Sequence, residues 1–193
     1  MEDLQCRPAV FLDRDGVLTE EKGYITRTGD LAIYPYARRC VARIREMGYL
    51  AVVVTNQAAV GMGLLPEETL REMNETLRRD TGVDAVYYCP HHPKAALTAY
   101  RLDCSCRKPA VGLFRRAAAD FQIELSGSYM IGDRASDILA GKRLGVKTVL
   151  LESGYGMERL EFDITPDYYA QDLREACGLI AGILQERGLG WEK

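Results

Sequence analysis

The stretch Ala9-Val10-Phe11-Leu12-Asp13-Arg14-Asp15-Gly16-Val17 sets the fold prediction for the whole chain. Its first four residues are apolar, which is typical of a short buried strand, and two carboxylates follow directly. Residues i and i+2 of an extended segment point the same way, so we expect Asp13 and Asp15 to face one pocket. Gly16 then allows a sharp turn. A turn with an Asx cap explains the stretch equally well, so the stretch alone does not decide its role.

Outward from this stretch, apolar runs alternate with helical patterns. Further strands are expected at residues 50–54, 83–88, 129–131 and 146–151, and helices at 35–47, from 66 onward, at 111–121, through 138–144 and at 172–187. Continuous apolar strands separated by helices predict a parallel sheet that is covered on both faces. We therefore expect one three-layer, Rossmann-like α/β domain spanning residues 1–193.

Composition excludes several classes of protein. Hydrophobic residues make up 47% and charged residues 27% of the chain, as in ordinary soluble globular proteins. A net charge of −3 and a pI of about 5.5 lack the basic excess of nucleic-acid binders. No run approaches the roughly 18 apolar residues of a membrane span, and no signal-peptide pattern is visible. We expect a cytoplasmic protein without nucleic-acid or membrane partners, whose six cysteines bind metal or lie buried rather than form disulfides.

Polar or reactive residues occur where four of these strands end. They are Asp13, Thr55, Cys89 and Asp133. Ligands of parallel sheets bind beyond these strand ends, so Thr55 could hold phosphate oxygens and Asp133 could bind Mg²⁺. Arg107-Lys108 supplies cations for developing phosphoryl charge. Each signal alone fits a loop start, surface charge or a helix N-cap at least as well. Their order along the chain indicates phosphoryl chemistry.

This order of motifs resembles the haloacid dehalogenase superfamily of phosphatases, which has a D-x-D motif, a Thr or Ser, a Lys and an acidic G-D-x-x-x-D motif. The resemblance implies that Asp13 is the nucleophile and Asp15 the general acid and base. It also implies that Thr55 and Lys108 stabilise the phosphoryl group.

The same resemblance implies a catalytic Mg²⁺ site. Asp133 would bind the ion together with the side chain of Asp13 and a group at Asp15, and Asp137 would support the site. No large insertion follows Asp15 or separates Thr55 from Lys108, which leaves little room for a cap domain. We therefore expect an open active site and a monomer.

A second cluster lies between residues 89 and 106, which hold three of the six cysteines and both histidines. Thiolate and imidazole are the ligands of structural zinc, and three Cys with one His complete a tetrahedron without an open position for water. Buried thiols with incidental histidines are the other interpretation, which this clustering disfavours. We expect a structural Zn²⁺ that pins a loop leading into Arg107-Lys108, although the chemistry does not select between His91 and His92.

The two halves of this cluster, Cys89-Pro90-His91-His92-Pro93 and Cys104-Ser105-Cys106-Arg107-Lys108-Pro109, resemble the zinc loop of D-glycero-D-manno-heptose 1,7-bisphosphate 7-phosphatases. Histidinol-phosphate phosphatases have a similar loop. The resemblance selects His91 as the zinc ligand beside Cys89, Cys104 and Cys106. It implies substrate contacts at Glu21-Lys22-Gly23-Tyr24, Asn56-Gln57-Ala58, Arg107 and Arg134. Ala58, Ala59 and Met62 depart from the Ser, Gly and Arg of the family's loop, and Arg134 stands where many relatives have lysine.

Three functional hypotheses follow. The leading one is a phosphohydrolase that removes the C7 phosphate of a heptose 1,7-bisphosphate, giving heptose 1-phosphate for nucleotide-activated heptose synthesis. Its alternative within the same chemistry is a histidinol-phosphate phosphatase. A non-enzymatic zinc-binding interaction module is the third hypothesis. It would explain the cysteines but not the ordered set of acidic and basic residues.

Overall fold

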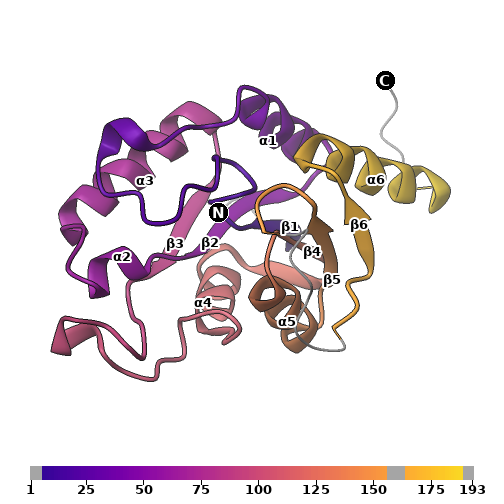
Figure 1. The fold of residues 1–193 in the computed structure, drawn as a ribbon. Helices are drawn as coiled ribbons and strands as arrows, with labels where there is room; N and C mark the ends of the chain where they lie inside the picture. The colour runs from indigo at the N-terminus through magenta and orange to yellow at the C-terminus, as the bar shows by residue number, and fades with distance from the viewer. Residues whose placement is uncertain (1–5, 156–163, 189–193) are drawn as a thin grey trace, which may run out of the picture.

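The computed structural model describes residues 6–155 and 164–188, so the N-terminal residues in which no signal pattern is visible lie mostly outside it. Its centre is a six-stranded parallel sheet with the strand order β3-β2-β1-β4-β5-β6 (Figure 1). The strands are β1 (Arg7–Leu12), β2 (Leu50–Asn56), β3 (Ala85–Cys89), β4 (Ile123–Gly132), β5 (Lys147–Leu151) and β6 (Tyr168–Ala170). The parallel α/β sheet expected from the sequence is confirmed.

Helices cover both faces of the sheet (Figure 1). One face carries α1 (Ala37–Glu46), α3 (Glu67–Thr81) and α6 (Leu173–Glu186), and the other carries α4 (Gly112–Phe121) and α5 (Ala135–Leu144). A short helix, α2 (Ala58–Gly61), follows β2, and single 3-10 turns lie at Thr28–Asp30 and Thr98–Tyr100. The structure therefore has the three expected layers.

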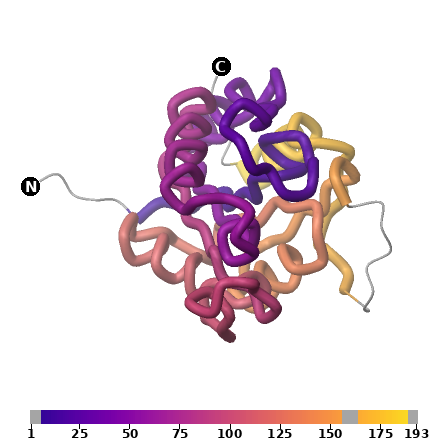
Figure 2. Tube along the Cα trace, turned by 60° about the vertical axis from the view of Figure 1, so that its left-hand side comes forward, coloured from indigo at the N-terminus to yellow at the C-terminus, as the bar shows by residue number. Residues whose placement is uncertain are grey.

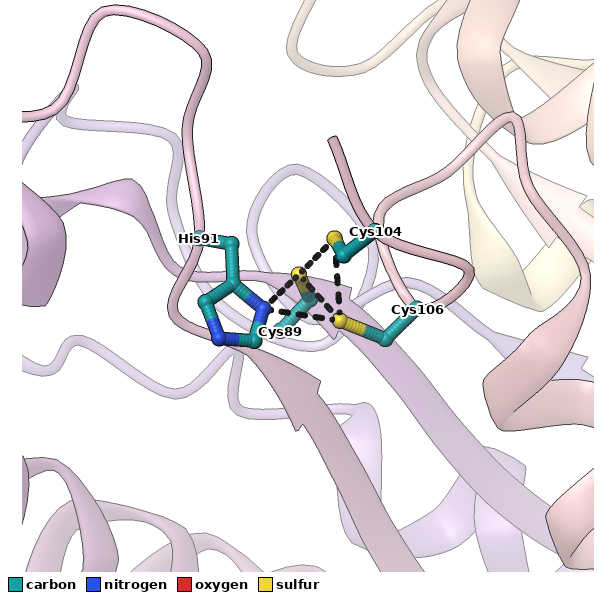
Figure 3. A group of neighbouring side chains, drawn as sticks. All are labelled: Cys89, His91, Cys104 and Cys106. Atoms are coloured by element: carbon teal, nitrogen blue, oxygen red, sulfur yellow. Dashed lines mark hydrogen bonds between the residues drawn. The ribbon is translucent and has the colours of Figure 1, made fainter. Parts of the chain in front are cut away.

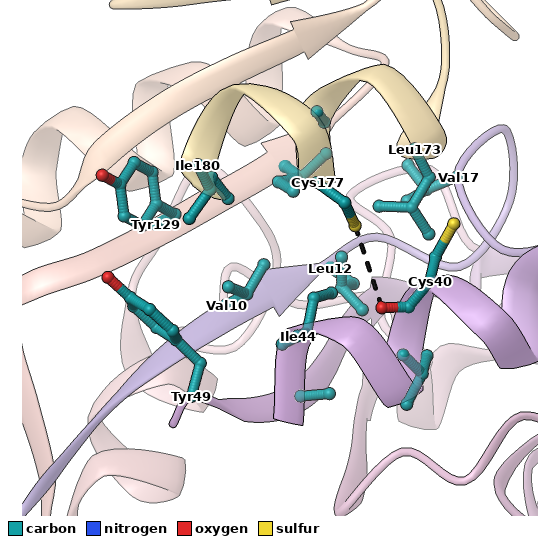
Figure 4. Close-up of a cluster of buried hydrophobic side chains, with 14 of the residues drawn as sticks. Val10, Leu12, Val17, Cys40, Ile44, Tyr49, Tyr129, Leu173, Cys177 and Ile180 are labelled. Atoms are coloured by element: carbon teal, nitrogen blue, oxygen red, sulfur yellow. Dashed lines mark hydrogen bonds between the residues drawn. The ribbon is translucent and has the colours of Figure 1, made fainter. Parts of the chain in front are cut away.

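The strands bury both of their faces, as their apolar sequences predict. Val10 and Leu12 of β1 pack into the cluster beneath α1 and α6, where Figure 4 places them beside Ile44 and Ile180. The intervening Phe11 points to the opposite layer, beneath α4 and α5. Fully burying one such side chain stabilises the fold by roughly 1.5–3 kcal/mol. Because both of its faces are buried, β1 is a rigid support for Asp13 and for the loop that follows.

The strand order reverses between β1 and β4, and this reversal positions the site. Because β1 pairs with β2 on one side and β4 on the other, Leu12 lies level with both Val53 and Ile131. The Asp13 amide donates to the Ile131 carbonyl oxygen at 3.0 Å, which ties the residue after β1 to the neighbouring strand. In open parallel sheets, ligands bind in the crevice at such a reversal.

Candidate active site and metal centres

A cavity of about 430 Å³ lies beyond these strand ends. Eleven of its lining residues were predicted from the sequence: Asp13, Asp15, Glu21, Gly23, Tyr24, Asn56, Gln57, Ala58, Arg107, Lys108 and Arg134. Figure 2 shows the indigo segment after β1 in the upper half of the view and the segment between β3 and α4 at the bottom, and residues of both segments line the cavity. Thr55 and Asp133 are buried behind the cavity, and Lys22 pairs at 3.0 Å with Glu20 outside its lining.

Lys108 is the buried centre of the charged cluster. Its ammonium lies 2.8 Å from Asp13 Oδ1 and 2.7 Å from Asp137 Oδ1, and it donates to the Val54 carbonyl oxygen at 2.7 Å. Burial alone would lower the pKa of Lys108, but the facing Asp13 and Asp137 raise it overall. A permanently charged ammonium therefore sits against the Asp13 carboxylate, where it can offset negative charge brought in by a phosphoryl group.

Asp133 is fully buried next to this cluster, and one of its oxygens has a partner while the other does not. Oδ2 accepts from the Tyr155 amide at 2.9 Å, whereas Oδ1 is buried without a hydrogen bond among the described residues. Burial, followed by the charges of Asp13 and Asp137, raises the pKa of Asp133 to about 8. Gly16 is required here, because a Cβ would collide with the Asp133 carboxylate and its φ is +80°.

These features fit an oxygen-coordinated cation. Asp13, Asp133 and Asp137 each place a carboxylate oxygen within 4.8 Å of the others. Both Asp137 oxygens are engaged, one by Lys108 and one by the Arg134 amide at 3.0 Å, so Asp13 and Asp133 are the side chains left for a metal. A divalent cation such as Mg²⁺ would relieve their repulsion and satisfy the orphaned Asp133 oxygen.

Another part of the cavity wall combines charge and an aromatic ring. Arg134 pairs with Glu21 at 3.2 Å, and its guanidinium carbon lies 3.9 Å from the centre of the Tyr155 ring. The Gly23 amide donates to Glu21 Oε1 at 2.6 Å, so the segment after β1 is tied to the same wall. This arrangement can present hydrogen-bond donors and an aromatic face to a polar substrate.

Sulfur and nitrogen atoms of Cys89, His91, Cys104 and Cys106 form a second candidate metal centre (Figure 3). The spacings between neighbouring ligand atoms run from 2.8 Å for Cys106–Cys89 to 3.6 Å for Cys89–Cys104, with His91 Nδ1 3.1 Å from Cys106 Sγ. A tetrahedral zinc would separate the sulfurs by about 3.8 Å, so the ligands need to spread by up to about 1 Å. The donor set therefore suits a tetrahedral ion, and the atom that His91 offers is Nδ1.

The loop that carries these four ligands (residues 89–106, called the metal loop below) is connected to the active site by hydrogen bonds. Arg107 donates to the His91 carbonyl oxygen at 3.1 Å. The Asn56 side chain holds the Lys108 backbone from both sides, since its Oδ1 accepts from the Lys108 amide at 2.9 Å and its Nδ2 donates to the Lys108 carbonyl oxygen at 3.1 Å. Asn56 thus fixes the backbone of Lys108 from the end of β2.

Sequence reasoning missed five residues of the cavity lining: Ile25, Ala59, His92, Ser136 and Tyr155. His92 was considered only as a possible metal ligand. Its Nδ1 accepts from the Lys94 amide at 3.1 Å, and burial, Arg107 and Lys94 lower its pKa. A neutral ring with Nδ1 occupied carries its hydrogen on Nε2, which makes His92 a hydrogen-bond donor.

Comparison with known proteins agrees with this fold. A family model described as HAD-hydrolase-like matches residues 105–176. The D-glycero-beta-D-manno-heptose-1,7-bisphosphate 7-phosphatase of Haemophilus ducreyi is 39% identical over 155 residues, covering 77% of this chain and 85% of the relative. The D-glycero-D-manno-heptose-1,7-bisphosphate 7-phosphatase of Chlorobaculum tepidum is 33% identical over 193 residues, with 93% and 97% covered.

A solved structure gives the same result. The D,D-heptose 1,7-bisphosphate phosphatase from B. bronchiseptica, crystallised with magnesium and phosphate, superposes with a TM-score of 0.79 at 26% identity, covering 93% of this chain and 99% of that one. The fold is therefore that of a HAD-like phosphatase. Within that class, the chain belongs to the D-glycero-D-manno-heptose-1,7-bisphosphate 7-phosphatase family. Among the described residues, no helix is long and apolar enough to cross a membrane.

Proposed function

We propose that this chain removes the C7 phosphate of D-glycero-D-manno-heptose 1,7-bisphosphate, leaving heptose 1-phosphate for nucleotide-activated heptose synthesis. The chemistry rests on one observation above all: Asp13 and Asp15 line the same cavity while Lys108 lies 2.8 Å from Asp13 Oδ1. The choice of substrate rests on the names of the relatives. The whole chain would act as a single catalytic domain.

In the first step, the Asp13 carboxylate attacks phosphorus and the bond from phosphorus to the C7 oxygen breaks. Oδ1 of Asp13 is held by Lys108 and by the Arg14 amide at 2.8 Å. Oδ2 makes no hydrogen bond within the described ranges and is therefore available to attack. The Asp15 carboxyl gives its proton to the departing sugar oxygen, which would otherwise leave as an unstable alkoxide.

In the second step, Asp15 takes a proton from water, and the resulting hydroxide attacks the aspartyl phosphate. Inorganic phosphate is released and the Asp13 carboxylate is restored. Lys108 remains against the reacting carboxylate in both steps, and the Thr55 hydroxyl, buried at the end of β2, would help to orient the phosphoryl oxygens.

Two metal ions complete the proposal. Mg²⁺ would be held by Asp13, Asp133 and the backbone carbonyl of Asp15, because the Asp15 carboxylate is directed toward Arg14. When bound, it would neutralise charge on the substrate phosphate. Zn²⁺ would be held by Cys89, His91, Cys104 and Cys106 and would have a structural role, since these four ligands leave no open position.

The test is phosphate release with Mg²⁺ from three substrates: the α and β anomers of heptose 1,7-bisphosphate, and histidinol phosphate. We expect one heptose anomer to give the highest kcat/KM, and Asp13→Asn to abolish turnover. Asp80→Asn, an exposed carboxylate on α3, is the matched control and should retain full activity. A preference for histidinol phosphate would overturn the substrate, and substantial turnover by Asp13→Asn would overturn the nucleophile.

A further inference from the structure

Arg14 stands between the two catalytic carboxylates in sequence, yet it is directed into the protein. Only 1% of its surface is exposed, and it is among the largest fully buried side chains. Removing a guanidinium from water costs several kcal/mol unless the surroundings supply matched hydrogen bonds. Arg14 is also absent from the residues that line the cavity. Its burial therefore calls for a role other than substrate contact.

The guanidinium of Arg14 grips the Asp15 carboxylate with two parallel hydrogen bonds. Nε donates to Oδ1 at 3.0 Å and Nη2 donates to Oδ2 at 2.9 Å. Such a bidentate pair fixes the plane of the carboxylate as well as its distance, which a single point charge cannot do. Arg14 therefore determines how Asp15 is rotated.

Gln57 closes this pair into a ring of three side chains. Its Oε1 accepts from Arg14 Nη2 at 2.8 Å, and its Nε2 donates to Asp15 Oδ2 at 2.8 Å. The ring fixes the orientation of the amide, because only its oxygen can accept from a guanidinium and only its nitrogen can donate to a carboxylate. The second hydrogen of Nε2 goes to Thr55 Oγ1 at 2.9 Å, so the ring is anchored to β2.

The other side of the carboxylate is also supported, because Thr19 Oγ1 lies 3.0 Å from Asp15 Oδ1. Within this group both Asp15 and Gln57 line the cavity, and 14% of the Asp15 side chain is exposed. Arg14, with 1%, approaches Asp15 from the protein side. Whatever Arg14 contributes to a reaction must therefore pass through the two residues it holds, of which Asp15 is the one that can transfer a proton.

We propose that Arg14 and Gln57 are positioning residues that aim the Asp15 carboxyl at the oxygen between phosphorus and the leaving sugar. The proposal rests on the proposed function, in which Asp15 protonates that oxygen as the phosphorus–oxygen bond breaks and later takes a proton from water. It also gives Gln57 a role different from the substrate contact expected from its sequence position. Both polar atoms of its amide are used inside the protein.

A positioning role and a purely structural role predict different kinetics. Loss of structure lowers the activity toward every substrate alike. Misplacement of Asp15 as general acid slows phosphoryl transfer to Asp13 only where the leaving group needs a proton, and kcat/KM reports this first step, whereas the water step is common to both esters. A sugar alkoxide needs that proton, whereas p-nitrophenolate is stable enough to leave without it. The ratio of rates on these two kinds of phosphate ester therefore reports on Asp15.

The experiment compares Arg14→Met, Arg14→Lys and Gln57→Met with the wild type, using heptose 1,7-bisphosphate and p-nitrophenyl phosphate in the presence of Mg²⁺. We expect both Met variants to lose kcat/KM on the sugar ester by on the order of 10²-fold, with a loss of only a few-fold on p-nitrophenyl phosphate. Arg14→Lys should restore activity only in part, since an ammonium lacks the fork. Arg78→Met, an exposed arginine on α3, is the matched control.

Thermal unfolding of each variant separates misfolding from misplacement. If Arg14→Met does not fold, Gln57→Met decides the question, because it opens the ring while leaving the Arg14–Asp15 pair intact. Equal losses of kcat/KM on the two esters in a folded variant would overturn this inference and leave the proposed function standing. Failure of the wild type to release phosphate from any ester would instead overturn the proposed function.

Discussion

At the scale of single residues, the central feature is one buried ammonium among three carboxylates. Lys108 pairs with Asp13 and Asp137, and Asp133 adds a third carboxyl group, one oxygen of which lacks a hydrogen bond within the described part of the chain. Removing one partner of a buried charge pair leaves the others uncompensated. Lys108 thus has two roles that can be separated, in stability and in chemistry.

Lys108→Met should affect both roles. We expect the folded protein to lose about 3–5 kcal/mol of stability in urea denaturation at neutral pH, because the Asp13 and Asp137 charges lose their partner. Phosphatase activity should fall below detection. Lys147→Met, which removes a half-exposed lysine on β5, should change stability by less than about 0.5 kcal/mol. A Lys108→Met protein as stable as the control would contradict the account of the buried cluster.

At the scale of elements, the metal loop is connected to the site through two residues that depend on it differently. Lys108 is held by Asn56, Val54, Asp13 and Asp137, none of which belongs to the loop. Arg107 is held by the carbonyl oxygen of His91, which does belong to it. Loss of the bound ion should therefore displace Arg107 more than Lys108.

Cys104→Ser tests this difference. We expect the bound zinc, measured by elemental analysis, to fall well below one equivalent, and KM for the sugar bisphosphate to rise by a larger factor than kcat falls. Cys6→Ser changes an exposed cysteine outside the cluster and should retain both zinc and KM. A fall in kcat with KM unchanged would mean that the loop positions Lys108 after all.

The sequence predicted the elements whose patterns are long and missed those that are short. Both β6 (Tyr168–Ala170) and α2 (Ala58–Gly61) escaped prediction, because three or four residues carry no measurable period. The start of β4 was placed at residue 129 rather than at Ile123, since Ser126-Gly127-Ser128 interrupts the apolar run. Thr55 proved to be the penultimate residue of β2 and Cys89 the last residue of β3, rather than the first residues beyond these strands.

Prediction of the candidate site had a similar limit. The carboxylates and cations were found because each follows a strand or precedes a helix, and that placement is written in the local pattern. The ring of Arg14, Asp15 and Gln57 was not found, because a residue 43 positions away completes it. The cavity position of His92 was equally hidden, since it depends on how the metal loop packs against the strand ends.

At the scale of the whole molecule, the fold tolerates a site that opposes its stability. In the folded chain, burial and the neighbouring Asp13 and Asp137 raise the pKa of Asp133 to about 8 from its ordinary value of 3.8. Between these values the folded state binds a proton that the unfolded state has lost, so stability without a cation falls as pH rises. The lowered pKa of His92 has the opposite effect, but only below the ordinary histidine value of 6.5. The window from 6.5 to about 8 therefore reports on Asp133.

Thermal unfolding of the zinc-loaded protein without Mg²⁺ should therefore show Tm falling across this window. The free energy of unfolding should decrease by at most about 1.4 kcal/mol per pH unit. Added Mg²⁺ should raise Tm, and more so at the upper end of the pH window, because it binds the ionised carboxylates of the folded state.

Asp133→Asn keeps the shape of the side chain and removes its charge. That variant should have a higher Tm without Mg²⁺, a flatter pH dependence and little response to the ion, together with lost activity. Asp80→Asn should behave like the wild type. A Tm that rises through the window, or an Asp133→Asn protein that Mg²⁺ still stabilises fully, would mean that Asp133 is not where the fold gives up stability for metal binding.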